Sequence, residues 1–385
     1  MLKNFWYVAE ESANVSQERP IKARLLGQDF VLFRDRSGRA NCLSDVCIHR
    51  GASLSGGKVV GSCVECPYHG WQFDHHGDCV RVPAQEGSPV PKKARVDAYP
   101  TQERYGWVWV FLGDLPESER PPIPEFPEYT SGEFRFIRGE FRWNASAARV
   151  VENGLDFAHA AFVHDGAFGD RNEPHISEYE VVEHRFGADA SLNLSPPSPK
   201  GIWGLLRRKR APTPARPGFN LSGNVTRLRV DLTARWTQIL FDANTPVDEN
   251  TTLTRWIQGR NFFKSPLFDK DARRRVLMIF EQDARVLSEI QPEELPYDLT
   301  EEVSVKSDGL PIAYRKMRQK YINLGYQIDA HAIAENYHGR RAVVIPSPRR
   351  RDPNDTIKWV LDEVPMVTSP RRRKSLPLSP EDPVK

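Results

Sequence analysis

"CIHRGASLSGG" at residues 47–57 and "CPYHGWQFD" at residues 66–74 are the two stretches that decide the fold. Each offers one cysteine and, two or three positions later, one histidine, within a turn rich in small residues. Together they give the pattern Cys-x-His-x16-Cys-x2-His, whose members are Cys47, His49, Cys66 and His69. Thiolates and imidazoles repeated at short, matched spacing indicate a metal centre held by two loops.

The ligand types indicate which metal centre this is. Two thiolates and two imidazoles suit two irons, one held by sulfur and one by nitrogen, which is the ligand set of a Rieske [2Fe-2S] cluster. A Cys2His2 zinc site is the alternative. Zinc sites usually pair Cys with Cys and His with His, whereas here each loop offers one of each.

Composition excludes several classes of protein. The chain has 385 residues and a formal net charge of +3 from 54 basic and 51 acidic side chains, too balanced to indicate nucleic acid as a partner. No run of about 18 apolar residues occurs, and the first 15 residues carry acids where a signal peptide needs an apolar run. All 5 cysteines fall between Cys42 and Cys79, unlike a disulfide scaffold. We therefore expect a cytoplasmic protein with no transmembrane segment.

Two domains fit this length. Residues 1–115 contain short runs of β-branched and aromatic residues separated by Gly and Asp turns, which predicts an all-β domain. Proline-rich residues 116–134 predict an extended linker that lies outside either core. Residues 135–368 predict a second domain that mixes strands with helices, and residues 369–385 a disordered tail. Within the second domain, the many Pro, Lys and Arg of residues 195–220 predict a surface loop.

The second domain contains a second set of candidate metal ligands. Helices are predicted at 145–160, 266–290 and 310–325. Asp156-x2-His159-x4-His164 lies at the end of the first. Asp156 and His159 would share a helix face, but His159 and His164 would diverge by about 140° on an unbroken helix. If both bind one ion, the helix must bend or end between them; a histidine pair without metal is the alternative.

Asp283 supplies a third ligand. It is spaced with Val276, Phe280 and Leu287 on one stripe of the helix predicted at 266–290, so the carboxylate lies among apolar residues. A buried carboxylate needs a cation, which could be an arginine or a metal. With His159 and His164 it would make a 2-His-1-carboxylate triad, which leaves positions on Fe(II) open for O2.

Over roughly residues 5–345 the chain resembles the Rieske non-haem iron oxygenases. The resemblance rests on the four cluster ligands, on Pro67, Tyr68, Gly70 and Trp71 around the second pair, on the D-x2-H-x4-H segment and on the later helical Asp. It implies an α+β fold class: an N-terminal all-β Rieske domain, then an α+β catalytic domain with an antiparallel sheet flanked by helices. It also implies that Asp156 links a ligand histidine to the Rieske histidine of a neighbouring subunit. Asn153, three residues before Asp156, is expected to play a supporting role at the same site.

The implied activity is that of a terminal oxygenase with a [2Fe-2S] cluster and a mononuclear Fe(II). The chain has no nicotinamide- or flavin-binding loop, so electrons must come from a separate reductase, with a ferredoxin expected. A homotrimer and a small organic substrate are implied as well. The single-chain layout resembles the branch of pheophorbide a oxygenase, O-demethylases and saxitoxin-type hydroxylases, which favours monooxygenation over cis-dihydroxylation. A Rieske electron carrier is the alternative from another class, and it would not need the triad.

Overall fold

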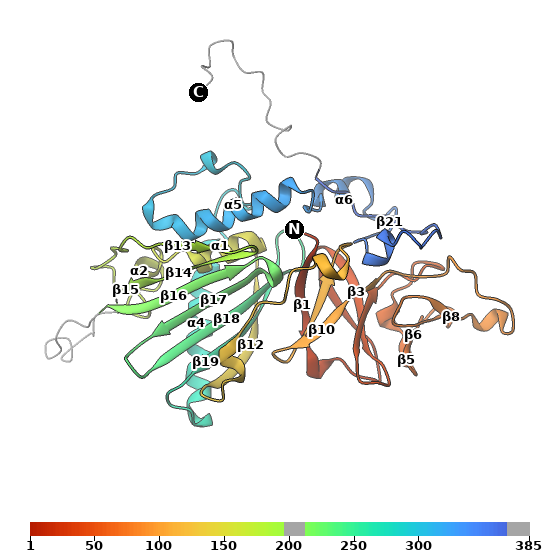
Figure 1. Cartoon of the computed structure of the whole chain (residues 1–385), viewed down its shortest axis with the longest axis horizontal. Coiled ribbons are helices and arrows are strands. Elements are labelled where there is room, and N and C mark those ends of the chain that lie inside the picture. The colour runs from red at the N-terminus through yellow and green to blue at the C-terminus, as the bar shows by residue number, and fades with distance from the viewer. Residues whose placement is uncertain (196–211, 368–385) are drawn as a thin grey trace, which may run out of the picture.

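The computed structural model describes residues 1–195 and 212–367 of the chain. These residues form two lobes that lie side by side along the long axis of the molecule (Figure 1). Small antiparallel sheets build the N-terminal lobe, and the second lobe has one large antiparallel sheet with helices against it. The predicted fold class is therefore confirmed. The predicted tail at 369–385 lies outside the described residues.

Three antiparallel sheets build the N-terminal lobe. In sheet order their strands are β1 (Phe5–Glu11), β11 (Trp107–Leu112) and β10 (Thr101–Arg104); β2 (Ile21–Leu25), β3 (Gln28–Arg34), β4 (Ala40–Ser44) and β9 (Ala98–Tyr99); and β5 (Lys58–Val60), β6 (Cys63–Glu65), β7 (Gln72–Phe73) and β8 (Cys79–Arg81). The β5–β8 sheet lies at the outer end of this lobe (Figure 1). The second cysteine–histidine loop connects β6 to β7, and the first lies between β4 and β5.

The sequence WVWVFL of β11 shows why the two lobes share cores. All of its residues are buried, and successive side chains of a strand point to opposite faces. The aromatic members Trp107, Trp109 and Phe111 face one apolar cluster, whereas the aliphatic members face another. Because both clusters also contain residues of the second lobe, this strand joins the lobes.

An eight-stranded antiparallel sheet forms the centre of the second lobe. Its order is β12 (Arg135–Trp143), β19 (Thr252–Arg260), β18 (Thr237–Pro246), β17 (Val225–Asp231), β16 (Thr213–Asn220), β14 (Gly187–Ala190) and β13 (Val181–Glu183), with β15 (Leu192–Leu194) also pairing with β16. The helices are α1 (Ala147–Leu155), α2 (Ala160–Val163), α4 (Asp269–Leu287), α5 (Gly309–Asn323) and α6 (Ala330–Asn336).

The two faces of the large sheet have different partners. On β18, Ile239, Phe241 and Ala243 face the N-terminal lobe, in the cluster that contains Trp107. The alternate residue Leu240 packs in the cluster formed with α1 and α4. Alternation at period two therefore sends the even-numbered residues of β18 toward these helices.

The prediction that the proline-rich linker lies outside both cores is wrong. Ile123 and Phe126 are both buried in the cluster that joins the lobes, and Phe126 stacks on Phe241 with ring centroids 4.5 Å apart. Proline keeps this segment extended, but the two apolar residues between the prolines pack inward and stabilise the contact.

The loop predicted at 195–220 is wrong in its last third, because residues 213–220 form β16. Ala215, Pro217 and Phe219 are buried at alternate positions, as in a strand with one face on a core. Overall composition hid this local alternation. Residues 196–211 lie outside the described part of the chain.

The segment after α6 returns to the N-terminal lobe. It includes β20 (Val343–Val344) and β21 (Asp362–Glu363), which pair in parallel. Arg350 donates two hydrogen bonds to the Asp97 carboxylate, at 2.8 and 2.7 Å, and both side chains are buried. The segment is thus fastened to the lobe that carries the cysteine–histidine loops.

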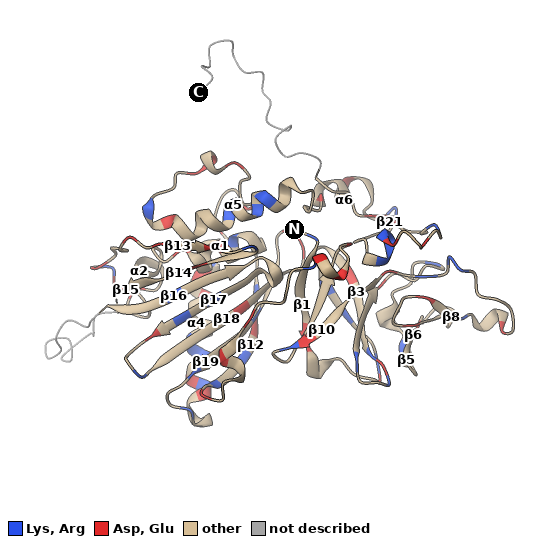
Figure 2. Ribbon diagram, in the orientation of Figure 1, with Lys and Arg blue, Asp and Glu red and all other residues tan. Residues whose placement is uncertain are grey.

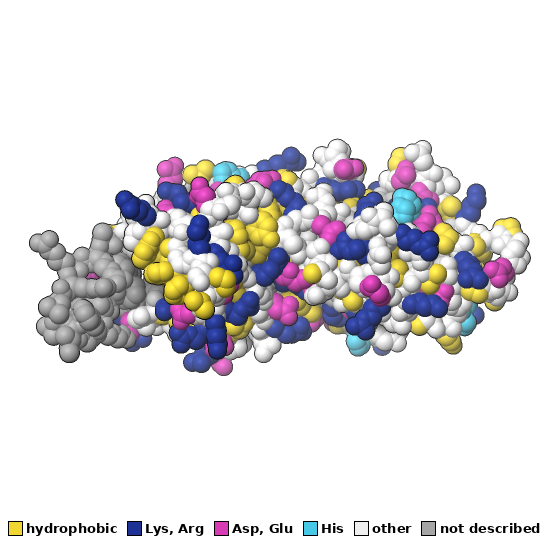
Figure 3. Space-filling view, turned by 90° about the horizontal axis from the view of Figure 1, so that it is seen from below, with side chains coloured by type: hydrophobic (Ala, Val, Ile, Leu, Met, Phe, Trp, Pro, Cys, Tyr) yellow, Lys and Arg dark blue, Asp and Glu magenta, His cyan; other side chains and the backbone are white. Residues whose placement is uncertain are grey.

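Surface charge is mixed in sign. Lys and Arg are interspersed with Asp and Glu over both lobes (Figure 2), and the face seen from below shows the same pattern (Figure 3). No helix among the described residues is long and apolar enough to cross a membrane.

We predict that Arg350→Leu lowers the free energy of unfolding by about 3 kcal/mol, because it leaves the Asp97 carboxylate buried without its cation. Urea titration followed by circular dichroism measures this. Arg341→Leu is the matched control, since its pair with Asp362 is exposed and should change stability by less than about 0.5 kcal/mol. Equal effects of the two substitutions would contradict the prediction.

Candidate functional site

The two cysteine–histidine loops have the same backbone geometry. In each, the cysteine N–H donates to the carbonyl five residues later, and the glycine four residues later donates back to the cysteine carbonyl. These bonds join Cys47 with Ala52 and Gly51, and Cys66 with Trp71 and Gly70. Both glycines have positive φ, at 74° and 69°, which favours glycine at the closing position. Two matched turns therefore present their ligands to a common point.

The cysteine and histidine side chains differ in exposure to solvent, as a Rieske cluster requires. Cys47 and Cys66 are buried, whereas His69 is exposed and His49 is partly exposed. The two Nδ1 atoms lie 3.1 Å apart, as expected for two ligands of one iron. Trp71 stacks on His49, with ring centroids 4.5 Å apart, and fixes that ring. The sulfur pair is thus placed inward and the nitrogen pair outward.

Burial raises the pKa of the Cys47 thiol to about 12. A thiolate there would need positive charge beside it, and a metal cluster supplies this charge. The donor set and its burial both fit a [2Fe-2S] cluster of the Rieske type.

The second site lies in the other lobe, against α4. His159 and His164 flank the four-residue helix α2, as its N-cap and C-cap residues. Asp283 projects from the buried stripe of α4, as predicted from its spacing with Val276 and Phe280. A short 3-10 turn, Pro266–Phe268, leads directly into α4. The Ser265 hydroxyl accepts a hydrogen bond from the Leu267 N–H and caps this turn.

The three side chains converge on one point. The Nε2 atoms of His159 and His164 are 3.2 Å apart, and Asp283 Oδ1 lies 3.3 and 3.1 Å from them. Three ligands about 2.1 Å from one ion lie about 3.0 Å apart when they share an octahedral face. The three nearly equal distances fit one divalent cation held on one side only.

Charge in this site also fits a cation. Asp283 Oδ1 is buried and has no hydrogen-bond partner of acceptable geometry among the described residues. Burial lowers the pKa of His159, but the carboxylates of Asp156 and Asp283 outweigh it and raise that pKa to about 9. Both carboxylates thus draw positive charge toward the centre.

One residue that orients a histidine was not found from the sequence. His164 Nδ1 lies 2.8 Å from Gln282 Oε1, which is an acceptor, so Nδ1 carries the proton and Nε2 is free to bind a cation. Gln282 precedes Asp283 on α4, and no sequence pattern distinguishes it from the other polar residues of that helix.

The predicted helix 145–160 ends earlier than expected and is wrong from residue 156 on. α1 ends at Leu155, and Asp156 is its C-cap residue with extended backbone. Asp156 and His159 therefore do not share a helix face, and the chain breaks before His159, not between the two histidines. Asp156 Oδ2 still lies 3.7 Å from His159 Nδ1, while its other oxygen accepts from the Ala158 N–H at 2.8 Å.

A cavity of about 90 Å³ opens on the three converging residues. Its lining includes Asn153, Asp156 and Asp242, with Leu240, Phe168 and Phe280 as apolar walls. A second, surface hollow of about 220 Å³ is also lined by Asn153 and Asp156. These two residues therefore stand between the outside of the protein and the inner cavity.

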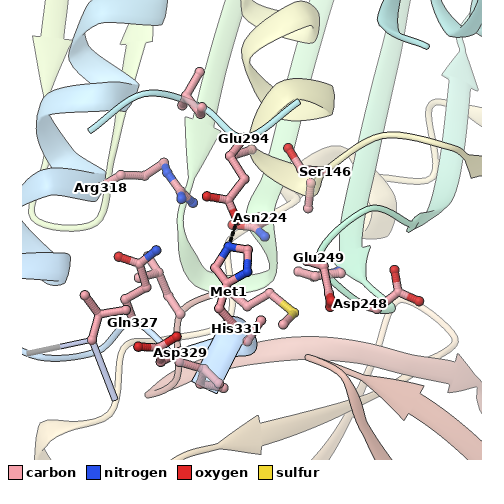
Figure 4. A pocket seen from close by; sticks show the side chains of 18 of the residues that line it. Met1, Ser146, Asn224, Asp248, Glu249, Glu294, Arg318, Gln327, Asp329 and His331 are labelled. Atoms are coloured by element: carbon pink, nitrogen blue, oxygen red, sulfur yellow. Dashed lines mark ion pairs between the residues drawn. The ribbon is translucent and has the colours of Figure 1, made fainter. Parts of the chain in front are cut away.

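A larger cavity, of about 240 Å³, has a different character. It lies between the first residues of the chain, α5 and α6, and contains the exposed ion pair of Glu294 and His331 (Figure 4). None of its described lining residues belongs to the group of His159, His164 and Asp283. The smaller cavity is therefore the one that adjoins the candidate metal ligands.

Two family models match the chain. The Rieske [2Fe-2S] domain matches residues 5–100, and the vanillate O-demethylase oxygenase C-terminal domain matches residues 143–324. The first covers both cysteine–histidine loops, and the second covers all three converging residues.

Relatives match over most of the chain. Methylxanthine N1-demethylase NdmA of Pseudomonas putida is 32% identical over 327 residues, which are 82% of this chain and 88% of NdmA. The N3-demethylase NdmB of the same organism is 29% identical over 83% of this chain and 89% of its own length. The structure of NdmA with caffeine superposes with a TM-score of 0.70 at 28% identity, over 83% of this chain and 90% of that one. Dicamba monooxygenase bound to dicamba, at 22% identity, has the same fold, with a TM-score of 0.67 over 84% and 98% of the two chains.

We predict that Asp283→Ala removes about one iron per chain and keeps the brown colour and absorbance of the cluster, because it deletes one of three ligands in one lobe and leaves the other lobe intact. Metal analysis with visible absorbance measures both. Asp271→Ala, an exposed carboxylate on the same helix, is the control and should change neither. Full iron content in Asp283→Ala would exclude this residue as a ligand.

Proposed function

The chain belongs to the Rieske oxygenases, and we propose that it is the terminal oxygenase of a system that demethylates or hydroxylates a small organic molecule. The observation that carries the proposal is the pair of sites: one whose donors suit a [2Fe-2S] cluster, and one with two histidines and a carboxylate beside a cavity. An electron carrier of the Rieske type would need only the first.

The proposed roles follow from the geometry. Cys47 and Cys66 would hold one iron of the cluster and His49 and His69 the other. His159, His164 and Asp283 would hold the mononuclear Fe(II) on one side, so that its remaining positions face the cavity. When bound, the cluster supplies electrons one at a time and the mononuclear iron supplies the activation of O2.

The protein's own contribution is position and exclusion of water. Gln282 fixes the His164 ring, and the apolar walls of the cavity keep bulk solvent from the reacting carbon. Oxidative demethylation would consume one O2, two electrons and two protons, and would yield the demethylated product, formaldehyde and water. Relatives named as N-demethylases and monooxygenases favour this reaction over cis-dihydroxylation.

Electrons would have to pass between subunits. The cluster loops and the α2–α4 site lie at opposite ends of the long axis of the molecule (Figure 1), so one chain cannot bring them together. A second copy could set its exposed His69 against the surface hollow beside Asp156. A head-to-tail contact of this kind must close into a ring or polymerise, and we propose a homotrimer.

The electron donor and the cellular location are proposed from the exposed edge of the cluster loops and from the free cysteines. A separate reductase, with a ferredoxin, would reach the cluster at the part of its exposed edge that the neighbouring subunit leaves uncovered; Tyr68 at this edge is 64% exposed. A cytoplasmic location fits the free thiols of Cys42, Cys63 and Cys79, none of which forms a disulfide in the described residues.

The activity can be tested with a generic reductase and ferredoxin, a panel of N-methyl and O-methyl compounds, and oxygen labelled with the heavy isotope. We expect one compound or more to release formaldehyde in equal amount to demethylated product, or to carry one labelled oxygen. Asp283→Ala should form none. Two labelled oxygens in a single product would favour cis-dihydroxylation, and no labelled product from any compound would favour the carrier.

We predict that co-expression of two inactive variants restores activity. Asp156→Asn keeps its own cluster but should lose the electron route into its mononuclear site, because the charge beside His159 is gone. Cys66→Ala has no cluster but keeps Asp156. In a mixed ring, the cluster of the first can serve the second across the subunit contact.

Single-turnover oxidation of the cluster, followed by stopped-flow absorbance, would show the recovery. Co-expressed Asp156→Asn and Asp283→Ala are the control pair, because neither has both a working mononuclear site and an intact Asp156. Mixed rings as inactive as the single variants would mean that electrons do not cross in this way.

A further inference from the structure

Asp242 is a buried carboxyl group that no step above uses. It lies on the face of β18 that is turned toward α1 and α4, and it lines the same cavity as His159, His164 and Asp283. Its direct neighbours across the sheet are Thr226 on β17 and Trp256 on β19. Asp242 is only 8% exposed, so its carboxyl group meets the cavity and not the solvent.

The surroundings disfavour the charged form of this carboxyl group. Burial raises the pKa of Asp242 well above its ordinary value, and the hydrogen bond from Thr226 offsets only part of this. Apart from the two histidines, Arg227 is the only basic residue in the described lining of the cavity. Its guanidinium is paired with Glu128 from the linker, and it alternates with Thr226 toward the other face of the sheet. No lysine or arginine in the described lining is therefore available to pair with Asp242.

One hydrogen-bonding atom of the Asp242 carboxyl group has no partner in the part of the chain that the structure describes. A neutral carboxyl group has one O–H donor and an acceptor oxygen. A side-chain hydrogen bond joins this carboxyl group to Thr226, whose hydroxyl can donate to the acceptor oxygen. Asp242 Oδ1 is buried and has no partner among the described residues, so the O–H donor of the acid is what remains. A buried donor without a partner is unfavourable, and a ligand with an acceptor oxygen could remove this cost.

We propose that Asp242, as a neutral carboxylic acid, donates a hydrogen bond to a carbonyl oxygen of the substrate and thereby positions it over the mononuclear site. This inference rests on the proposed function and names the substrate class: small uncharged molecules with an amide, lactam or similar carbonyl. An anionic substrate would be buried beside Asp283 without a free lysine or arginine among the described cavity residues to pair with it, so we expect the site to disfavour carboxylates and sulfonates.

Two substitutions separate donation from other roles. Asp242→Asn keeps the shape, the absence of charge and an N–H donor. Asp242→Leu keeps the approximate volume and removes every hydrogen bond. Asp189→Leu removes an exposed carboxylate from β14, outside the cavity, and is the matched control.

Binding is measured by calorimetry on the anaerobic, iron-loaded enzyme with named probes. Caffeine and 1-methyl-2-pyridone carry lactam carbonyls, toluene has no acceptor, and toluene-4-sulfonate is an anion. We expect at least one carbonyl probe to bind the parent protein and Asp189→Leu about tenfold more tightly than toluene and toluene-4-sulfonate, since a neutral hydrogen bond contributes about 1.4 kcal/mol. Asp242→Asn should stay within about threefold, and Asp242→Leu should lose about tenfold.

Infrared difference spectra give a second readout that does not require Asp242→Leu to fold. The parent should show the carbonyl stretch of a protonated acid, absent in Asp242→Asn and shifted when a carbonyl probe binds. The inference is overturned by a missing band, by tighter binding of the anion, by failure of both carbonyl probes to bind, or by equal affinity of Asp242→Leu. Product formation is assayed in parallel. Probe binding that depends on Asp242, without any product, would remove the proposed function and leave this inference standing.

Discussion

One interaction dominates the second lobe: a buried carboxylate and two imidazoles meet at a point where a single bound cation would satisfy all three. Asp283 comes from α4, whereas His159 and His164 come from the two ends of α2. Their ligand atoms lie 3.1 to 3.3 Å apart. Holding a carboxylate in this apolar setting without a cation would cost several kcal/mol. The end of α1 at Leu155, the short α2 and the apolar stripe of α4 are the local features that make the meeting exact enough for one ion.

The two sites lie in different lobes, and this separation bears on how electrons would pass between them. One lobe turns its imidazole pair outward, and in the other Asn153 and Asp156 line both the inner cavity and the surface hollow. A ring of subunits would place the outward face of one chain against the hollow of the next, while the shared cores around Trp107 and Phe241 hold the two lobes of each chain in a fixed relation.

The sequence predicted those features that are set by local spacing. The pattern of Cys47, His49, Cys66 and His69 is specific because two short loops carry it, and Asp283 stands out as a carboxylate in an apolar stripe. The resemblance to the Rieske oxygenases is confirmed over most of the chain. The ligand assignments themselves stay predictions.

Other features depend on contacts that are distant in sequence, and these were missed. In the sequence, Asp242 is an ordinary polar residue of a predicted strand. The pairing of β17, β18 and β19 is what shows that it faces the cavity. Gln282 gains its role from His164, 118 residues away. The inward packing of Phe126 depends on Phe241 across the lobes, so proline content alone gave the wrong expectation.

We propose that His159, His164 and Asp283 hold one iron, apart from a two-iron cluster in the other lobe. Anomalous diffraction at the iron absorption edge can locate each iron. Three iron peaks per chain are expected, two at the cluster loops and one about 2.1 Å from each of the three ligand atoms. Peaks at the cluster alone, or a zinc signal between the histidines, would contradict it.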